Sequence, residues 1–316
     1  MGERDWRELL RKWFQMQNQL WVKGEAEALL DWVADEEAVW IREEEGRWRR
    51  VRKQQQERKV DPLKGESRLR VLKTLQQNSH QLQVWVRSEE RNWYRLHNEL
   101  WEQEEADDYR FDLVYKGDLW KIANLKREKL EQRKRESEER TEEANFLPYE
   151  IHQTKYDRQR AVQYAELWWN SYNPRYRHFD VDCTNFVSQA IHAGGIPMHF
   201  ARQRNQGWWY RDGRENWSYS WAVAHSLRNY LARGGPHLKA TAVNRADQLQ
   251  LGDIICYDWE GDGRWDHNTI VTAIDPRGMP LVNAHTVNSR RRYWDYRDSH
   301  AWREQTRYAF FHILDG

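Results

Sequence analysis

Hydrophobic residues change their spacing along this chain, and each change marks a different kind of element. In the first 50 residues, large apolar residues recur at helical spacing, which favours two amphipathic helices. Over 68–126 apolar and polar residues alternate instead, and a Lys-Gly-Asp turn at 116–118 closes a hairpin. The pattern predicts two or three helices followed by an antiparallel sheet, an α+β arrangement.

A stretch without any apolar stripe separates the two halves of the chain. Residues 128–143 are almost wholly Glu, Lys, Arg and Gln, a composition typical of a solvated helix or a helical linker. We therefore expect an N-terminal α+β domain over 1–127, a charged helical linker over 128–147 and a second domain over 148–316. The second domain should fold without the first, because the linker buries nothing obvious.

The second half contains a cysteine at the predicted start of a helix. Apolar residues follow Cys183 at helical spacing, Asp182 is a good N-cap, and the glycines at 194–195 end the helix. A thiol at that position lies at the positive end of the helix dipole, which favours the nucleophilic thiolate. The alternative is a buried structural cysteine, because free cysteine is often buried. Cys256 lies mid-strand and is expected to be such a core residue.

A histidine begins a strand-like run further along the chain. His267 precedes β-branched residues, and a type I turn signal at 275–278 predicts a hairpin with the strand that follows. Pairing across this turn would set residue 271 opposite Asn283, so that His267, Asn283 and His285 share one face of the sheet. A slip of one residue would turn Asn283 and His285 to the other face.

These motifs occur in an order that resembles a known family, the putative amidase domain of Gram-positive bacteria, which is itself similar to papain-like cell-wall amidases and peptidases of the CHAP and Nlp types. The resemblance covers about residues 150–316. It implies a papain-like α+β fold and a cysteine hydrolase. The matching stretches are Tyr156-Asp157-Arg158, Trp168-Trp169-Asn170, Asp182 to Gln189, Ala193-Gly194-Gly195, Gly252-Asp253 and Asn283-Ala284-His285-Thr286.

The resemblance and the spacing together assign candidate roles. Cys183 is expected to attack an amide carbonyl and form a thioester, with its own backbone N–H holding the oxyanion, while His267 transfers the protons. Asn283 is the expected third catalytic member that orients the imidazole, and His285 is the alternative. The expected substrate is a peptide or a peptidoglycan-derived amide, and a peptidoglycan stem peptide, a small amide and a peptide tag all stay open. A substrate groove is expected beside three tryptophans, Trp208, Trp209 and Trp217.

Composition narrows the classes of partner. The 51 basic and 50 acidic residues nearly cancel, so no nucleic-acid partner is expected. No apolar run is long enough to span a membrane, and no signal peptide is seen, so the chain is expected to be cytoplasmic as written, and cell-wall action would need export. We expect no cofactor. The Gly/Asp-rich stretch 260–263 lacks the spacing of an EF-hand loop, so a plain turn without metal is expected.

The role of the N-terminal half is less defined by its sequence. Its last strands resemble those of SnoaL-like cone domains, and its tryptophans follow helical spacing, which favours core packing over sugar binding. A positioning or partner-binding module is the expected role. For the whole chain, the alternative to an enzyme is a catalytically inactive papain-like module that binds cell-wall or protein partners. The presence of both Cys183 and His267 argues against that alternative.

Overall fold

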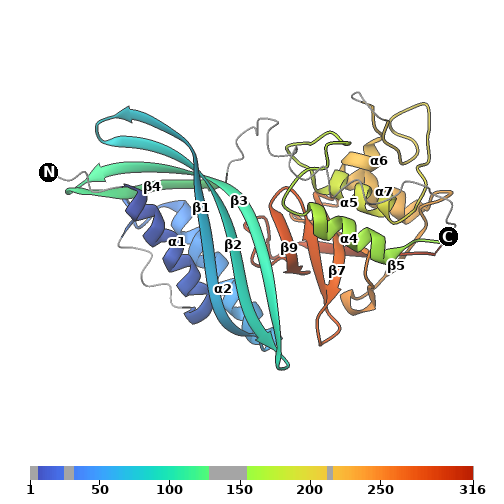
Figure 1. Ribbon diagram of the computed structural model, residues 1–316, viewed down its shortest axis with the longest axis horizontal. Helices are drawn as coiled ribbons and strands as arrows, with labels where there is room; N and C mark the ends of the chain where they lie inside the picture. Colours follow the sequence, from blue (N-terminus) through green and yellow to red (C-terminus); the bar gives the residue numbers. More distant parts are fainter. Residues whose placement is uncertain (1–5, 25–31, 128–154, 212–215, 316) are drawn as a thin grey trace. The chain divides into compact units, whose positions relative to one another are not determined.

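The structure is a computed structural model, and it describes residues 6–24, 32–127, 155–211 and 216–315 (Figure 1). These residues divide into two units. The N-terminal unit holds the described residues up to Arg127 together with Tyr296–Trp302, and the C-terminal unit holds the others. Both units combine helices with antiparallel strands, which confirms the α+β class. The predicted linker, 128–147, lies outside the described residues.

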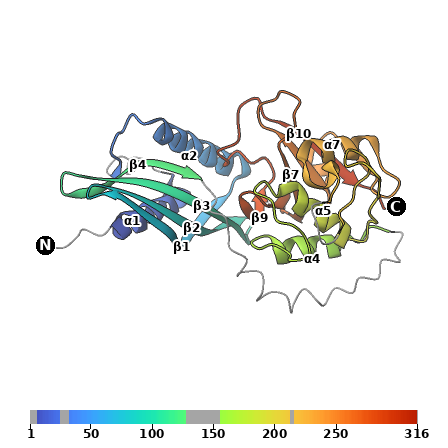
Figure 2. The same cartoon turned by 90° about the horizontal axis from the view of Figure 1, so that it is seen from above.

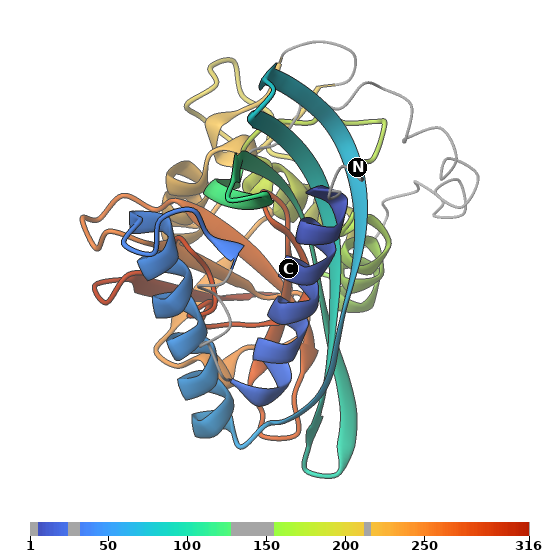
Figure 3. The same ribbon diagram turned by 90° about the vertical axis from the view of Figure 1, so that its left-hand side faces the viewer.

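The N-terminal unit consists of two helices packed on one antiparallel sheet, as the change in apolar spacing predicted. Helix α1 packs against β1 and α2, and Figure 3 shows both helices alongside the curved strands. The sheet order is β1-β2-β3-β4. The elements are α1 (Trp6–Lys23), α2 (Val39–Arg58), β1 (Asp61–Asn78), β2 (Gln81–Leu96), β3 (Glu99–Lys116) and β4 (Leu119–Arg127).

Aromatic side chains fill the core between these helices and the sheet. Phe14 on α1 contacts Tyr109 and Phe111 on β3, with ring centroids 5.8 and 6.0 Å apart. Trp13 lies 5.7 Å from Trp40, and both are buried. Such ring pairs contribute roughly 0.5–1.5 kcal/mol each beyond their buried area. The helical spacing of the tryptophans therefore reflects core packing, as predicted.

One segment of this unit comes from the far end of the chain. Helix α2 binds Tyr296–Trp302 through Arg50, which donates hydrogen bonds to the carbonyl oxygens of Arg297 (2.8 Å) and Ser299 (3.1 Å). On the same helix, Glu44 lies 2.9 Å from Nε2 of His300. The N-terminal unit therefore includes a part of the chain that the division by sequence gave to the second domain.

The C-terminal unit has a six-stranded antiparallel sheet in the order β9-β8-β7-β6-β10-β5. Helices α4 and α5 pack against each other and on β7 and β8, and Figure 2 shows them on the same side of the strands. The elements are α4 (Arg158–Trp168), α5 (Cys183–Ala193), α6 (Tyr219–Ala222), α7 (Ala224–Arg233), β5 (Ala240–Val243), the 3₁₀ turn Ala246–Gln248, β6 (Ile254–Asp258), β7 (His267–Ile274), β8 (Pro280–Ala284), β9 (Asn288–Tyr293) and β10 (Arg307–Ile313).

The core of this unit lies between α4, α5 and one face of the sheet. It contains Phe186 and Ile191 from α5 and Cys256 and Ile270 from the strands, all of them fully buried. The expectation that Cys256 is a core residue is confirmed. Within the described ranges, no helix has the length and apolar character that a membrane span requires.

The attachment of Tyr296–Trp302 to α2 can be tested by removing its main donor. We expect Arg50→Ala to lower the free energy of unfolding by about 1–3 kcal/mol, because two hydrogen bonds from a charged group are lost. Arg49→Ala is the matched control, since Arg49 is exposed and pairs with Glu45 on its own helix. Chemical denaturation measures both. Equal stabilities of the two variants would show that the segment is not held in this way.

Candidate active site

The candidate nucleophile lies at the start of a helix that is buried on every side. Helix α5 begins at Cys183 and is followed by Gly194, as predicted, and every residue from Cys183 to His192 is buried. The sequence predicted a helix with a single buried face. The difference arises because α4, α6, α7, β7 and β8 all pack around α5. The side chain of Cys183 is consequently only 1 % exposed.

Three polar groups surround the sulfur of Cys183. They are the backbone N–H of Asn268, the hydroxyl of Thr184, whose Oγ1 lies 3.7 Å from the sulfur, and the hydroxyl of Thr286, which is buried and has no hydrogen-bond partner in the resting site. The amide of Asn268 in turn donates to Thr184 Oγ1 at 3.0 Å. Burial raises the pKa of the Cys183 thiol, and these donors oppose the rise without cancelling it. Burial thus acts against the bias toward thiolate that the helix end was expected to give.

The candidate base, His267, is the first residue of β7. The next residue, Asn268, is the one whose backbone N–H donates to the sulfur of Cys183. His267 is 7 % exposed, and its ring lies against Tyr257 and Trp259, with centroids 5.5 and 5.7 Å away. Burial and the positive charge of Arg292 lower the pKa of His267 to about 3. The imidazole is thus neutral at neutral pH and can accept a proton. Asn268, which follows His267 directly, faces α5 together with Ile270. Side chains alternate along a strand, so the imidazole of His267 lies on the opposite face of β7, against the expectation that it faces the helix that carries the thiol.

The hairpin between β7 and β8 has a register that differs from the prediction. The backbone N–H of Asp275 bonds Met279 O at 2.8 Å, which confirms the turn. A bulge at residue 272 then shifts the pairing, so Asn283 lies opposite Ile270 and not opposite residue 271. Opposite residues share a face, and residue 270 faces away from the side of His267. The prediction that His267 and Asn283 share a face is therefore wrong.

Asn283 uses its whole amide to join three elements. Its Oδ1 accepts from Thr272 Oγ1 (2.8 Å) and from the N–H of Arg291 (2.8 Å). Its Nδ2 donates to Ala165 O (3.2 Å) and to Glu166 Oε1 (3.1 Å) on α4. An asparagine amide can make about four hydrogen bonds. To orient His267, Asn283 would have to exchange one of them, and its role as third catalytic member stays a prediction.

His285 is bound to the residue that precedes the nucleophile. Its Nδ1 lies 2.7 Å from Asp182 Oδ2, and its Nε2 lies 2.8 Å from Trp168 O. Its ring stacks on Phe186 with the centroids 4.1 Å apart. Asp182 precedes α5 as predicted, but its carboxylate makes no capping bond to the helix. The structure thus joins His285 to the start of α5 through Asp182.

The three tryptophans predicted beside a substrate groove do not share one environment. Trp208 and Trp209 are 0 and 1 % exposed, and their indole N–H groups bond Ser188 Oγ and Gln206 O. Because these two rings pack inside the unit, they cannot form the wall of an open groove, which corrects that expectation. Trp217 is only partly buried and remains a candidate.

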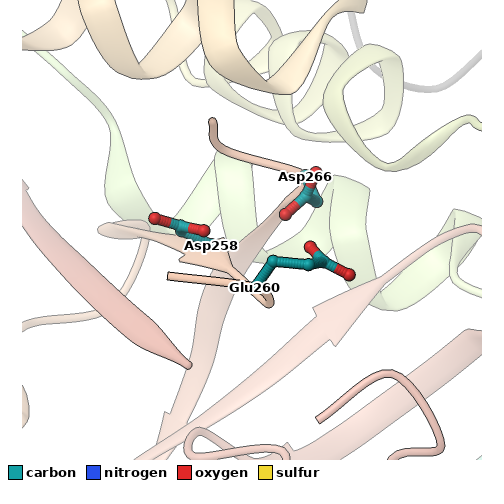
Figure 4. A group of neighbouring side chains, drawn as sticks. All are labelled: Asp258, Glu260 and Asp266. Carbon is teal, nitrogen blue, oxygen red and sulfur yellow. The ribbon is translucent and has the colours of Figure 1, made fainter. Parts of the chain in front are cut away.

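Three carboxylates lie together beyond the end of β6, next to the strand of His267. The oxygens of Asp258, Glu260 and Asp266 approach within 4.8 Å of one another (Figure 4). Asp258 accepts from the N–H groups of residues 262 and 263, and Asp266 accepts from that of residue 259. Burial and the charge of Asp266 raise the pKa of Glu260. The carboxylates thus brace the turn that the sequence predicted, and we assign no cation to them.

The sequence interpretation missed the polar residues nearest to the sulfur. Asn268 follows His267 and Thr184 follows Cys183, and in each pair the sequence predicted a role only for the first residue. Thr286 has a positive φ of 88°, which a β-branched residue rarely adopts. Alternation along β7 could have indicated the position of Asn268. Ile270 is a core residue, and Asn268 lies two positions before it, so the two side chains share one face of the strand.

Comparison with known proteins shows which family the C-terminal part of the chain is similar to. The profile of the family described as a putative amidase domain matches residues 155–311. Two relatives from Bacillus subtilis (strain 168) are similar to the chain. Uncharacterized protein YhbB is 55 % identical over 161 residues, which are 51 % of each protein. Uncharacterized protein YjcM is 31 % identical over 137 residues, 40 % of this chain and 30 % of that protein.

The chain thus spans about half the length of YhbB and less of YjcM. A crystal structure of the intermembrane space region of the chloroplast protein ARC6 gives a TM-score of 0.29 with 14 % identity, over 40 % of this chain and 96 % of that chain. A likeness of that size carries no argument.

The protonation of Cys183 can be tested through its reaction with iodoacetamide. Because burial raises the pKa of this thiol, we expect its alkylation rate to climb steadily from pH 7 to pH 9. A thiolate stabilised at neutral pH would give a flat profile instead. Peptide mapping by mass spectrometry separates Cys183 from Cys256, whose pKa burial also raises. A plateau at Cys183 below pH 7 would contradict the neutral thiol.

The structural role of Asn283 can be separated from a catalytic one. We expect Asn283→Ala to lower the free energy of unfolding by about 2–4 kcal/mol, since it leaves several buried groups without partners. Asn244→Ala, at an exposed position, should change stability by less than about 0.5 kcal/mol. A variant at 283 with unchanged stability and a lower kcat would instead restore Asn283 as the residue that orients His267.

Proposed function

Residues 155–311 belong to the putative amidase domain family, and from this premise we propose that the C-terminal unit hydrolyses an amide bond with Cys183 as its nucleophile. The observation that carries the proposal is the sulfur of Cys183 at the start of α5, with the N–H of Asn268 and two hydroxyls around it. Structural cysteines in a core, such as Cys256, lie among apolar side chains instead.

The proposed reaction proceeds through a covalent thioester. The sulfur of Cys183 attacks the amide carbon while its proton passes to the neutral imidazole of His267, which for this step has to turn at the start of β7 from the opposite face of the strand. The C–N bond then breaks, and the amine leaves with the proton that the imidazolium returns. Water attacks the thioester in the second half, again losing a proton to His267, and the carboxylic acid and the free thiol are released.

The oxyanion formed in each half needs hydrogen-bond donors. The first N–H groups of a helix have no partner within the helix, and that of Cys183 is the proposed donor to the oxyanion. A low pKa of His267, about 3, keeps the base neutral over the whole physiological range. Charge therefore develops only during the reaction, where fixed dipoles in a buried site stabilise it best.

A papain-like arrangement is part of the proposal. In such folds a helix that begins with the cysteine packs on an antiparallel sheet that carries the histidine. Helix α5 packs on β7, the strand that begins with His267, and this contact supports the layer arrangement, although the imidazole lies on the other face of that strand. The order of Cys183 and His267 along the chain agrees with that fold class.

The proposed substrate is a peptide, with a peptidoglycan stem peptide as the specific candidate. Trp217 contacts Phe179 with ring centroids 4.8 Å apart, and the N–H of Phe179 donates to Asp182 at 3.0 Å, beside the nucleophile. The guanidinium groups of Arg177 and Arg204 lie 5.4 and 4.8 Å from the Trp217 ring. An aromatic surface next to cations suits a peptide that bears carboxylates. Action on a cell wall would require export from the cytoplasm.

A binding module without activity is the second candidate. The burial of Cys183 favours it, because a substrate has to reach a sulfur that is only 1 % exposed. The three donors around the sulfur argue against it, since a site kept only for binding has no need of them. Digestion of purified muropeptides separates the two candidates, because a binding module would retain them without cleaving them.

Substitution of the two reacting residues tests the proposal directly. We expect Cys183→Ala to abolish hydrolysis and His267→Ala to lower kcat by about 10²–10⁴-fold, the usual contribution of a general base. Cys256→Ala should keep its activity and lose some stability, since it leaves a small cavity. Product formation from muropeptides is followed by mass spectrometry, with circular dichroism as the check on folding. Full activity of Cys183→Ala would refute the assignment.

A further inference from the structure

Two consecutive residues after β8 bind two consecutive residues at the start of α5. His285 contacts Asp182, and the buried hydroxyl of Thr286, which has no hydrogen-bond partner, lies near the sulfur of Cys183. The two segments are about 100 positions apart in the chain, so only the fold brings them together. This paired contact differs from the role of an imidazole-orienting residue, which would have to reach His267.

Both ring nitrogens of His285 make short contacts. Trp168 O can only accept, so Nε2 of His285 donates to it at 2.8 Å. The Asp182 carboxylate accepts at Oδ1 from the N–H of Phe179 (3.0 Å) and from the amide of Asn185 (2.9 Å). Its other oxygen, Oδ2, lies 2.7 Å from Nδ1 of His285, so both oxygens of the carboxylate and both nitrogens of the ring are engaged.

Two aromatic rings also contact the imidazole of His285. Phe186 stacks on the ring at a centroid distance of 4.1 Å, and Tyr172 makes a T-shaped contact with it at 5.0 Å. The side chains of His285 and Asp182 are 3 and 1 % exposed. With both nitrogens bonded and two aromatic neighbours, the buried ring is held in place, and it fixes Asp182 in turn.

Thr286 is held in a conformation that its side chain disfavours. A φ of 88° places this β-branched residue in the left-handed region, which persists only where the surroundings enforce it. The hydroxyl is buried and has no hydrogen-bond partner in the resting site, while its proximity lowers the pKa of the Cys183 thiol against the effect of burial. The strained backbone thus holds an unsatisfied donor near the reacting atom.

We propose that His285 and Thr286 form a clamp on the nucleophile. His285 is a positioning residue, which fixes the backbone before Cys183 through its contact with Asp182. Thr286 is a catalytic residue, whose hydroxyl donates to the sulfur when the sulfur carries negative charge. The role in turnover rests on the proposed function, whereas the effect on the thiol does not require hydrolysis.

Three substitutions of Thr286 in the full-length chain test the hydroxyl. Thr286→Val removes the hydroxyl at nearly constant shape, Thr286→Ser keeps it, and Thr286→Gly removes it while relieving the strained φ. Alkylation of Cys183 by iodoacetamide, followed against pH by peptide mapping, is the readout. We expect the profiles of the Val and Gly variants to move to higher pH by about one unit, with a roughly tenfold slower rate at pH 8, and that of the Ser variant to stay in place.

The titratable groups whose charge acts on the sulfur are Asp182, directly before it, and Cys256 on β6. None of the Thr286 variants alters them, so a shift of the profile reports the hydroxyl alone. An unchanged profile in both the Val and the Gly variants would overturn the role of Thr286. A shift of equal size in the Ser variant would also overturn it, since that would assign the effect to packing.

The substitution His285→Gln tests the proposed role of His285 in positioning the start of α5. We expect a lower alkylation rate of Cys183 at every pH and a lower kcat with little change in KM, because the start of α5 is no longer fixed. A loss of kcat with unaltered alkylation would assign His285 to the orientation of His267 and overturn the clamp. If that variant does not fold, Asp182→Asn, which keeps the shape and removes the charge, gives the same comparison. If no amide is hydrolysed, the proposed function fails, while the alkylation profiles still decide the clamp.

Discussion

The Asp182 carboxylate is the contact on which the site depends. An ionised group in the interior costs several kcal/mol unless each oxygen has donors, and here the backbone of Phe179, the amide of Asn185 and the imidazole of His285 supply them. These donors come from the loop before α5, from its first turn and from the turn after β8. Because Cys183 follows Asp182 directly, the carboxylate connects three separate segments at the nucleophile.

The same burial that strengthens this contact also sets the protonation of the reacting groups. It raises the pKa of Cys183 and lowers that of His267, so both are neutral in the resting protein. An ion pair formed in advance would need its own stabilising partners. A neutral pair needs them only in the transition state, and the donors around the sulfur are fixed before the reaction begins. Burial therefore keeps the thiol and the imidazole neutral at rest, and the fixed donors stabilise charge only when it forms in the transition state.

The boundary between the halves of the chain follows contacts and not sequence order. Tyr296–Trp302 lies within the part that matches the family, yet it belongs to the N-terminal unit and is bound by Arg50. The residue just before it, Asp295, accepts a hydrogen bond from Tyr308 on β10, and Trp294 accepts one from Tyr257, the neighbour of His267. Removal of the N-terminal unit thus frees a segment whose flank lies beside the base.

Local signals in the sequence determined the elements: the start of α5 at Cys183, its end before Gly194, the turn at 275–278 and the change from helical to alternating spacing. Each of these depends on residues within a few positions, and turn chemistry and periodicity encode them directly. The tertiary structure decided the rest. The bulge at residue 272 turned Asn283 to the other face, and burial raises the pKa of the thiol against the expected bias. The partner of His285 lies about 100 residues away, and no periodicity specifies register, desolvation or contacts over that distance.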